Sequence, residues 1–220
     1  MPIVLYGNGK IAEVVFNYIA QDREVVAFTV SAKLRSGETF CGLPIVDYEN
    51  LSKHYPPCSH QLIIAVGYAE MNDLRQRRYA QGAEMGYGFA NYIHPNAVVN
   101  QSCKIGAGNI ILDGVSIQPN AVIGDNNFVW SNSVIAHGCV VGNNCWITSG
   151  VTIAGDSTIG SNSFLGVNCT IGHNLDVGAY TLVGAHSLVV RSTQAGSVAL
   201  APSAETHRLD SQRFVKFSKI

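Results

Sequence analysis

Aliphatic residues recur at every sixth position through the second half of the chain. Seventeen consecutive positions at this spacing, from Ile93 to Val189, are isoleucine, valine or leucine, with no insertion. Neither the 3.6-residue period of an α-helix nor the two-residue alternation of an ordinary strand produces this spacing. A unit of one short strand and one tight corner does, and three units complete a triangular coil. We therefore predict a parallel β-helix of stacked coils, each eighteen residues long.

Two further patterns fit this interpretation. The residue two positions before the aliphatic one is mostly small, as at Ala97, Cys103, Ala121, Ser133, Cys139, Cys145, Ser157, Ser163 and Cys169. A cysteine in this position acts as a small hydrophobic residue. Asn126, Asn144 and Asn162 are eighteen residues apart, each in a Gly-x-Asn sequence. Asparagine tolerates the left-handed backbone conformation that a sharp corner needs.

Short apolar runs alternate with helical patterns in the first ninety residues. The stretch "PIVLYGNGKIAEVVFNYIA" predicts a strand, a glycine turn and an amphipathic helix, and "REVVAFTV" and "HQLIIAVG" predict further strands. A second helix is expected just after Gly67. This order indicates a small Rossmann-like α/β domain with a parallel sheet over residues 1–90. The β-helix would span residues 91–195, and residues 196–220 would form a C-terminal tail.

The glycine turn is a candidate ligand site. Gly7, Gly9 and Ala12 match G-x-G-x-x-A, which is a weak signal by itself. A dinucleotide site calls for an acidic residue after the second strand, where this chain has Val30 and Ser31, so NAD is disfavoured. Two interpretations remain: a phosphate or nucleotide held at the helix N-terminus, or a βα turn without a ligand.

Charge and cysteine content exclude several functions. The formal net charge is −1, which does not suggest a general nucleic-acid or membrane-surface role. No secretory signal or membrane-spanning run is found, and we expect a cytoplasmic protein with reduced thiols, without a zinc or redox motif. Lysine and arginine are absent from residues 105–190 and return afterwards. The phosphate groups of a ligand bound to the β-helix would therefore need positively charged partners from the tail, where Arg208 and Lys216 are candidates.

His137 is the polar exception within the apolar stretch "SVIAHGCVV". It follows Ile135 by two residues, so the repeat predicts that its side chain points outward near a corner. Gly155 and His173 occupy the same place in the next two coils. From this pattern alone, His137 is a surface residue, a metal ligand or a catalyst.

Several stretches together resemble one family over nearly the whole chain. They are "YGNGK", "AVGYAEMNDLR", "YIHPNAVV", "SVIAHGCVVG" and a degenerate closing "VALAPSAETHR". The sequence is similar to the bacterial NeuD/PglD-type acetyltransferases of sugar biosynthesis. The resemblance implies an N-acetyltransferase that uses acetyl-CoA as co-substrate on a UDP- or dTDP-linked amino sugar. It also implies a homotrimer with active sites between neighbouring β-helices, and no metal, nucleic-acid or membrane partner.

The resemblance also implies roles for individual residues. His137 matches the general base, although Gly138 follows it where the family often has a carboxylate. The positions that match the nucleotide-contacting turns are Asn8, Gly9, Lys10, Val30, Ser31 and Gly67, with Tyr68 next to them. Asn72 and Arg75 on the following helix are expected either to reach the nucleotide or sugar or to form a solvated helix face. The positions along the acetyl and pantetheine path of CoA are Trp146, Gly155, Val167 and Ala185. The Gly155 N–H would stabilise the oxyanion.

We therefore expect an N-acetyltransferase acting on a nucleotide-linked 4-amino-4,6-dideoxyhexose, for a surface glycan such as lipopolysaccharide O-antigen. A sugar O-acetyltransferase of the sialic-acid type would share the same residues. A γ-type carbonic anhydrase would need a third histidine where Gly178 stands, and a non-catalytic scaffold would not bind CoA. A row of aromatic residues, Phe128, Trp146 and Phe164, is expected to lie exposed on one face of the β-helix and to mark the trimer interface.

Overall fold

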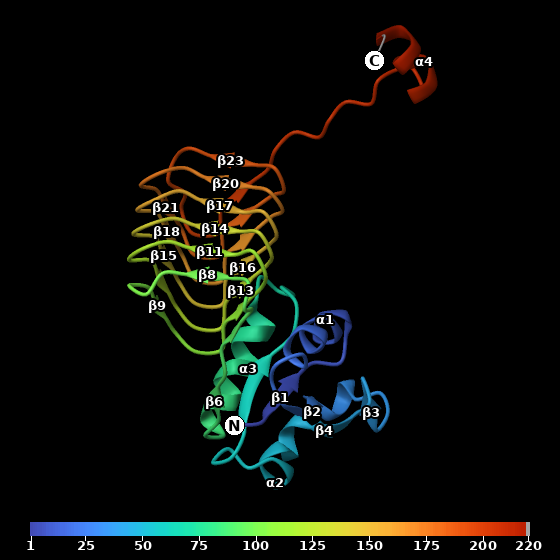
Figure 1. The fold of residues 1–220 in the computed structure, drawn as a ribbon, viewed down its shortest axis with the longest axis vertical. Helices are drawn as coiled ribbons and strands as arrows, with labels where there is room; N and C mark the ends of the chain where they lie inside the picture. The colour runs from blue at the N-terminus through green and yellow to red at the C-terminus, as the bar shows by residue number, and fades with distance from the viewer. Residues whose placement is uncertain (219–220) are drawn as a thin grey trace.

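The computed structural model describes residues 1–218 and confirms the two predicted architectures. A small α/β region lies at one end, a β-helix rises from it, and a C-terminal segment extends away from the last coil (Figure 1). The β-helix is the left-handed type built from hexapeptide units. One hydrophobic cluster fills its interior, and a second joins the α/β region to its surface.

The α/β region contains one six-stranded sheet in the order β3-β4-β2-β1-β5-β6. All neighbouring pairs are parallel except β3 and β4. The strands are β1 (Ile3–Tyr6), β2 (Val25–Val30), β3 (Thr39–Phe40), β4 (Leu43–Asp47), β5 (Gln61–Ile64) and β6 (Gly88–Phe89). The helices are α1 (Lys10–Ile19), α2 (Leu51–His54) and α3 (Asp73–Glu84), with two short 3₁₀ helices, η1 (Ala32–Leu34) and η2 (Tyr48–Asn50). Helix α3 begins later than expected because Glu70, Met71 and Asn72 have positive φ angles.

The β-helix has three faces, each a parallel sheet whose strands lie eighteen residues apart, except that β24 pairs with β22 sixteen residues before it, Val198 opposite Leu182. The first face contains β7 (Tyr92–Ile93), β10 (Ile110–Ile111), β13 (Phe128–Val129), β16 (Trp146–Ile147), β19 (Phe164–Leu165), β22 (Leu182–Val183) and β24 (Val198–Ala199). The second contains β8 (Val98–Val99), β11 (Ser116–Ile117), β14 (Val134–Ile135), β17 (Thr152–Ile153), β20 (Thr170–Ile171) and β23 (Leu188–Val189). The third contains β9 (Lys104–Ile105), β12 (Val122–Ile123), β15 (Val140–Val141), β18 (Thr158–Ile159) and β21 (Asp176–Val177).

The repeat positions behave as the sequence predicts. The second residue of nearly every strand is the aliphatic one and packs inside, as Ile135 and Ile153 do with no exposed surface. Asn126, Asn144 and Asn162 have φ angles of 55°, 59° and 63° at successive corners. Cys139, Cys145 and Cys169 in the small-residue position are buried, and burial raises the pKa of Cys145 to about 11.

The α/β region packs against the early strands of the first face of the β-helix. Phe128 and Trp146 are buried in the cluster that also contains Phe28 and Ile63 of the parallel sheet. The expected exposed row of aromatic residues is therefore wrong, because the same chain covers it. A trimer must be argued from other features.

Helix α3 is joined to the β-helix by buried polar contacts. Arg75 is 1% exposed and donates hydrogen bonds to the carbonyl groups of Asn144 (2.6 Å) and Cys145 (3.0 Å). The Asn72 side chain donates to the carbonyl of Asn162 at 3.1 Å. Because it is fully buried, Arg75 has a pKa lowered to about 9. This placement does not support the expected contact of Asn72 and Arg75 with substrate, nor the solvated helix face: both side chains bind the α/β region to the β-helix.

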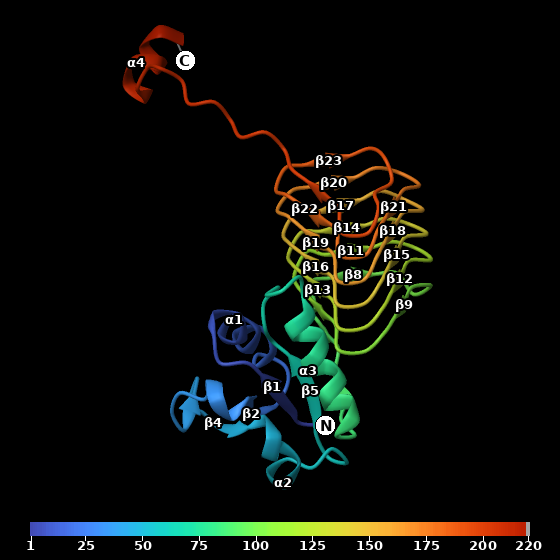
Figure 2. The same ribbon diagram turned by 180° about the vertical axis from the view of Figure 1, so that it is seen from behind.

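The C-terminal segment leaves the last coil and ends in α4 (Ser211–Ser218), which stands apart from the rest of the chain (Figures 1 and 2). Arg208 and Lys216 are exposed on this segment. Within one chain they therefore do not approach the β-helix.

We expect Arg75→Ala to lower the free energy of unfolding by about 2–4 kcal/mol, because it leaves buried carbonyl groups without a donor and opens a cavity beside Trp146. Urea denaturation would measure the change. The matched control is Arg77→Ala on the same helix, where an exposed ion pair with Glu70 is lost and little change is expected. Equal stability of the two variants would contradict a role for Arg75 in joining the two parts.

Candidate functional site

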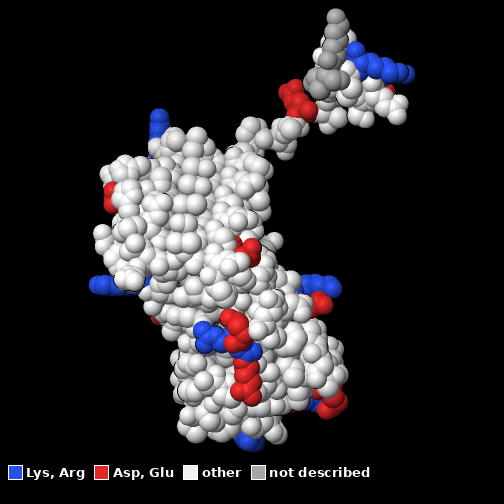
Figure 3. All heavy atoms as spheres, viewed as in Figure 1, with Lys and Arg blue, Asp and Glu red and all other residues white. Residues whose placement is uncertain are grey.

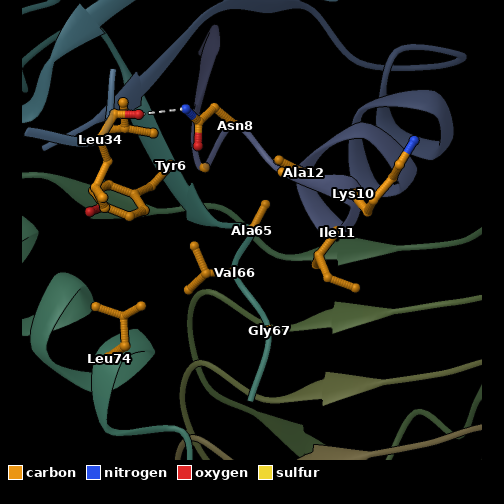
Figure 4. Close-up of a pocket in the computed structure, with 13 residues that line it drawn as sticks. Tyr6, Asn8, Lys10, Ile11, Ala12, Leu34, Ala65, Val66, Gly67 and Leu74 are labelled. Carbon is orange, nitrogen blue, oxygen red and sulfur yellow. Dashed lines mark hydrogen bonds between the residues drawn. The ribbon is translucent and has the colours of Figure 1, made fainter. Parts of the chain in front are cut away.

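A cavity of about 270 Å³ lies where the carboxyl ends of β1, β2 and β5 meet α1 (Figure 4). Open parallel sheets commonly bind ligands at this edge. The lining residues are Tyr6, Gly7, Asn8, Gly9, Lys10, Ile11, Ala12, Val30, Leu34, Ala65, Val66, Gly67 and Leu74. The structure thus brings together five residues singled out from the sequence: Asn8, Gly9, Lys10, Val30 and Gly67.

The glycine turn shapes this cavity. Gly7 has a φ angle of 138°, and a Cβ there would lie 2.6 Å from the carbonyl oxygen of Ala65. Only glycine lets the turn pass so close to β5. Gly9 caps α1 without a side chain, and a Cβ at this position would meet no atom within 4 Å. The first turn of α1 therefore presents free backbone N–H groups that suit an anion.

The polar side chains near the turn mostly hold neighbouring loops. The Asn8 amide donates to the carbonyl of Leu34 at 2.9 Å, the bond drawn in Figure 4. Ser31 lies outside the lining and donates to Glu49 at 2.7 Å. The Lys10 side chain is 94% exposed and pairs with Glu13. Glu49 was missed by the sequence analysis because it follows Ser31 by eighteen residues and meets it only in the fold.

Tyr68 connects the cavity to the first face of the β-helix. It follows the lining residue Gly67, is 53% exposed, and its ring lies 5.6 Å from that of Trp146 and 4.6 Å from that of Phe164. Trp146 itself is 2% exposed. A thioester cannot touch a side chain so covered, so this arrangement does not support the expected contact between Trp146 and the acetyl group.

His137 lies on the edge between the second and third faces, with its side chain outward as predicted. The side chain is 60% exposed. Its imidazole rests on the backbone of the next coil, where a Cβ at Gly155 would come within 2.6 Å of Cε1 and Nε2. Nε2 is 3.9 Å from Oδ2 of Asp156. Within residues 1–218 the Gly155 N–H donates no hydrogen bond, so it is free to face a ligand.

The candidate residues lie on separate parts of the β-helix. The α/β region and its cavity adjoin the first face, whereas His137 and Gly155 lie on the opposite edge. Val167 and Ala185, both exposed, lie on the edge between the first and second faces. Within one chain Gly155 lies at a different corner from Val167 and Ala185, so a CoA path along all three residues would require residues from two copies.

The surface of the β-helix is almost free of charged side chains on the side shown in Figure 3. Across residues 1–218, no three histidine, cysteine, aspartate or glutamate side chains gather as a metal site. None of the helices described is long and apolar enough to cross a membrane.

Comparisons with known proteins agree with this architecture. The family model described as bacterial transferase hexapeptide (six repeats) matches residues 120–155. No curated protein matches the chain in sequence. The perosamine N-acetyltransferase of Caulobacter crescentus, solved with CoA and GDP-perosamine, is 30% identical, with a TM-score of 0.83 over 91% of this chain and 94% of its own. In two of its structures one histidine is replaced, by asparagine or by alanine.

Two more distant structures share the fold. The acetyltransferase domain of PglB from Neisseria gonorrhoeae, solved with acetyl coenzyme A, is 22% identical with a TM-score of 0.82, covering 91% of this chain and 96% of that one. WeeI from Acinetobacter baumannii is 20% identical with a TM-score of 0.79, covering 91% and 97%.

We expect Gly7→Ala and Gly9→Ala to differ sharply in stability. A methyl group at Gly7 would collide with the Ala65 carbonyl in a backbone conformation that alanine rarely adopts, and a loss of about 2 kcal/mol or more is expected. A methyl group at Gly9 enters open space, so Tm should change by no more than a few degrees. Thermal unfolding of both variants checks this, and similar losses would contradict the described turn.

Proposed function

The chain belongs to the hexapeptide-repeat sugar N-acetyltransferases of the NeuD/PglD type, and on that premise we propose that its acceptor is a nucleotide-linked 4-amino-4,6-dideoxyhexose. Acetyl-CoA is the acetyl donor of this family. The observation that carries the proposal is the pairing of a glycine-turn cavity with an outward histidine on the β-helix. The cavity would supply the nucleotide site, and the histidine would supply the base.

The cavity is proposed to hold the nucleotide. The N-terminus of α1 suits the diphosphate, Val30 and Leu34 border the space for the nucleoside, and Ser31 follows Val30 just outside the lining. Tyr68, beside Gly67, is the exposed aromatic group nearest to this turn and is proposed to contact the sugar. The family resemblance implies a UDP or dTDP carrier, while the 30%-identical relative was solved with GDP-perosamine. Turnover of acetyl-CoA against UDP-, dTDP- and GDP-linked amino sugars would identify the carrier.

His137 is proposed as the general base. The sugar amine attacks the thioester carbonyl, a C–N bond forms, and the C–S bond breaks to release CoA. His137 takes a proton from the amine, and this proton then passes to the CoA sulfur. The Gly155 N–H, next to the imidazole, is proposed to donate to the oxyanion.

A homotrimer is proposed because one chain cannot complete this site. The cavity adjoins the first face, and His137 lies on the opposite edge of the same β-helix. A neighbouring copy would bring its His137 edge to the cavity of the first. The same contact would set Gly155 of one copy opposite Val167 and Ala185 of another, with the pantetheine arm between them.

The tail cations Arg208 and Lys216 remain our candidates for the CoA phosphates, since residues 105–190 carry no lysine or arginine.

A sugar O-acetyltransferase is the second candidate, because a hydroxyl acceptor needs the same base. Mass spectrometry of the product after mild alkali distinguishes the two, since an ester is hydrolysed and an amide survives. We further propose that the enzyme works in the cytoplasm on precursors of a surface polysaccharide such as O-antigen.

We expect His137→Asn to lower kcat by about 10²–10⁴-fold, because positioned base catalysis contributes that much. The KM for acetyl-CoA should change little. His173→Asn, two coils further along the same edge, is the control and should stay near the wild-type rate. Near-normal kcat for His137→Asn at neutral pH would show that another group takes the proton.

Subunit mixing tests the shared site. The His137→Asn variant keeps the cavity but lacks the base. The Gly9→Trp variant keeps the base, but its side chain fills the open space at the turn. If each site takes its base and its cavity from different chains, randomly mixed trimers should regain roughly a quarter of wild-type activity. Sites within one chain would regain none, and light scattering would show whether trimers form.

A further inference from the structure

The carboxylate of Asp156 lies directly beside the imidazole of His137, although nineteen residues separate them in sequence. The two residues occupy corresponding corners of successive coils. Oδ2 of Asp156 is 3.9 Å from Nε2 of His137. The imidazole packs against the backbone at Gly155, and any side chain at that position would displace it.

Gly138 makes room for this carboxylate. A Cβ at Gly138 would collide with Oδ1 of Asp156, so the space above the glycine is filled by the aspartate. Oδ1 thus faces Gly138, and Oδ2 faces the imidazole. The residue that follows the proposed base therefore has no side chain, and the next coil supplies a carboxylate in its place.

The fold itself does not require a charge at this position. On another edge, Asn132 and Asn168 fill the same space above Gly114 and Gly150. On the edge of Asp156, the left-handed corner residues one coil away on either side are Gly138 and Asn174. Among the left-handed residues of the β-helix that are not glycine, Asp156 is the one with a carboxylate within residues 1–218; the others are asparagine, tyrosine or histidine.

Few other groups compete for this carboxylate. Residues 105–190 contain no lysine or arginine. Gln118 from the preceding coil accepts a hydrogen bond from the His137 backbone N–H at 3.3 Å, and His173 follows two coils after His137 on the same edge. Within residues 1–218, His137 is the one ion-pair partner of the Asp156 carboxylate.

We propose that Asp156 is a positioning residue for His137, in place of the carboxylate that often follows the base in this family. The proposal rests on the base role of His137. Asp156 orients the ring so that Nε2 carries a proton toward the carboxylate, which leaves Nδ1 free to accept the proton of the sugar amine. Once His137 has taken that proton, the negative charge of Asp156 stabilises the imidazolium.

The test compares Asp156→Asn with Asp176→Asn. Asparagine fits the corner, as Asn174 shows, so the fold should be unchanged. Asp176 is exposed on the third face and provides an equal change in net charge. We expect Asp156→Asn to lower kcat about tenfold with little change in either KM, and Asp176→Asn to match the wild type. In the His137→Asn background, Asp156→Asn should have no further effect.

A second measurement does not depend on turnover. The ¹⁵N shifts of the neutral His137 imidazole, assigned by comparison with His137→Asn, report which nitrogen carries the proton. We expect the Nε2–H tautomer in the wild type and a mixture in Asp156→Asn. An unchanged tautomer, a kcat within twofold of the wild type, or an equal loss in the His137→Asn background would overturn the proposal. Failure of the wild type to acetylate any amino sugar would instead overturn the proposed function.

Discussion

The eighteen-residue register between coils is the constraint on which the rest of the molecule depends. From β7 to β23 each strand pairs with the strand eighteen residues away, as Val134 does with Thr152, and the aliphatic positions stack in the interior because of it. Glycine preserves this stacking where coils touch, since a Cβ at Gly142 or Gly166 would run into the backbone of the next coil. Without an insertion anywhere in the array, side chains eighteen residues apart become neighbours, and the candidate catalytic groups inherit their geometry from that spacing.

The second interface is of a different kind, because it joins unlike surfaces. The α/β region presents its parallel sheet and α3 to the first face, where aromatic rings fill the gap between them. Burial of an arginine costs free energy unless its N–H groups have hydrogen-bond acceptors. Arg75 donates to backbone carbonyl groups at a corner of the coils. This contact fixes the cavity relative to the β-helix. It also fixes the separation between the cavity and His137 in one chain, which is the reason for proposing an intersubunit site.

Most of the fold could be predicted from the sequence because its signals are periodic and local. The six-residue repeat, the left-handed asparagines and the glycine turn each depend on residues close together in the chain, and all three predictions are confirmed. The errors concern surfaces that meet across the fold. The row of Phe128, Trp146 and Phe164 marks an apolar face, but the sequence does not reveal that the α/β region covers it. For the same reason Asn72 and Arg75 were expected either at a ligand or on a solvated helix face, and both are buried at this interface. Asp156 was overlooked because its proximity to His137 appears only when coils are stacked.

Hydrogen bonds between the α/β region and the β-helix extend along the array as far as Tyr180, whose hydroxyl donates to Asp73 at 2.9 Å. By contrast, the last coil exposes Leu188, Val190, Val198 and Leu200, each at least 65% accessible. In a linear array each coil is supported by its immediate neighbours, so local stability varies along the axis. A force applied to the C-terminus would detach β24 first and then unfold the coils one after another. The unfolding force would rise at the coils that Arg75 contacts. Amide hydrogen exchange would follow the same gradient, so His137 lies in the part of the array that opens late.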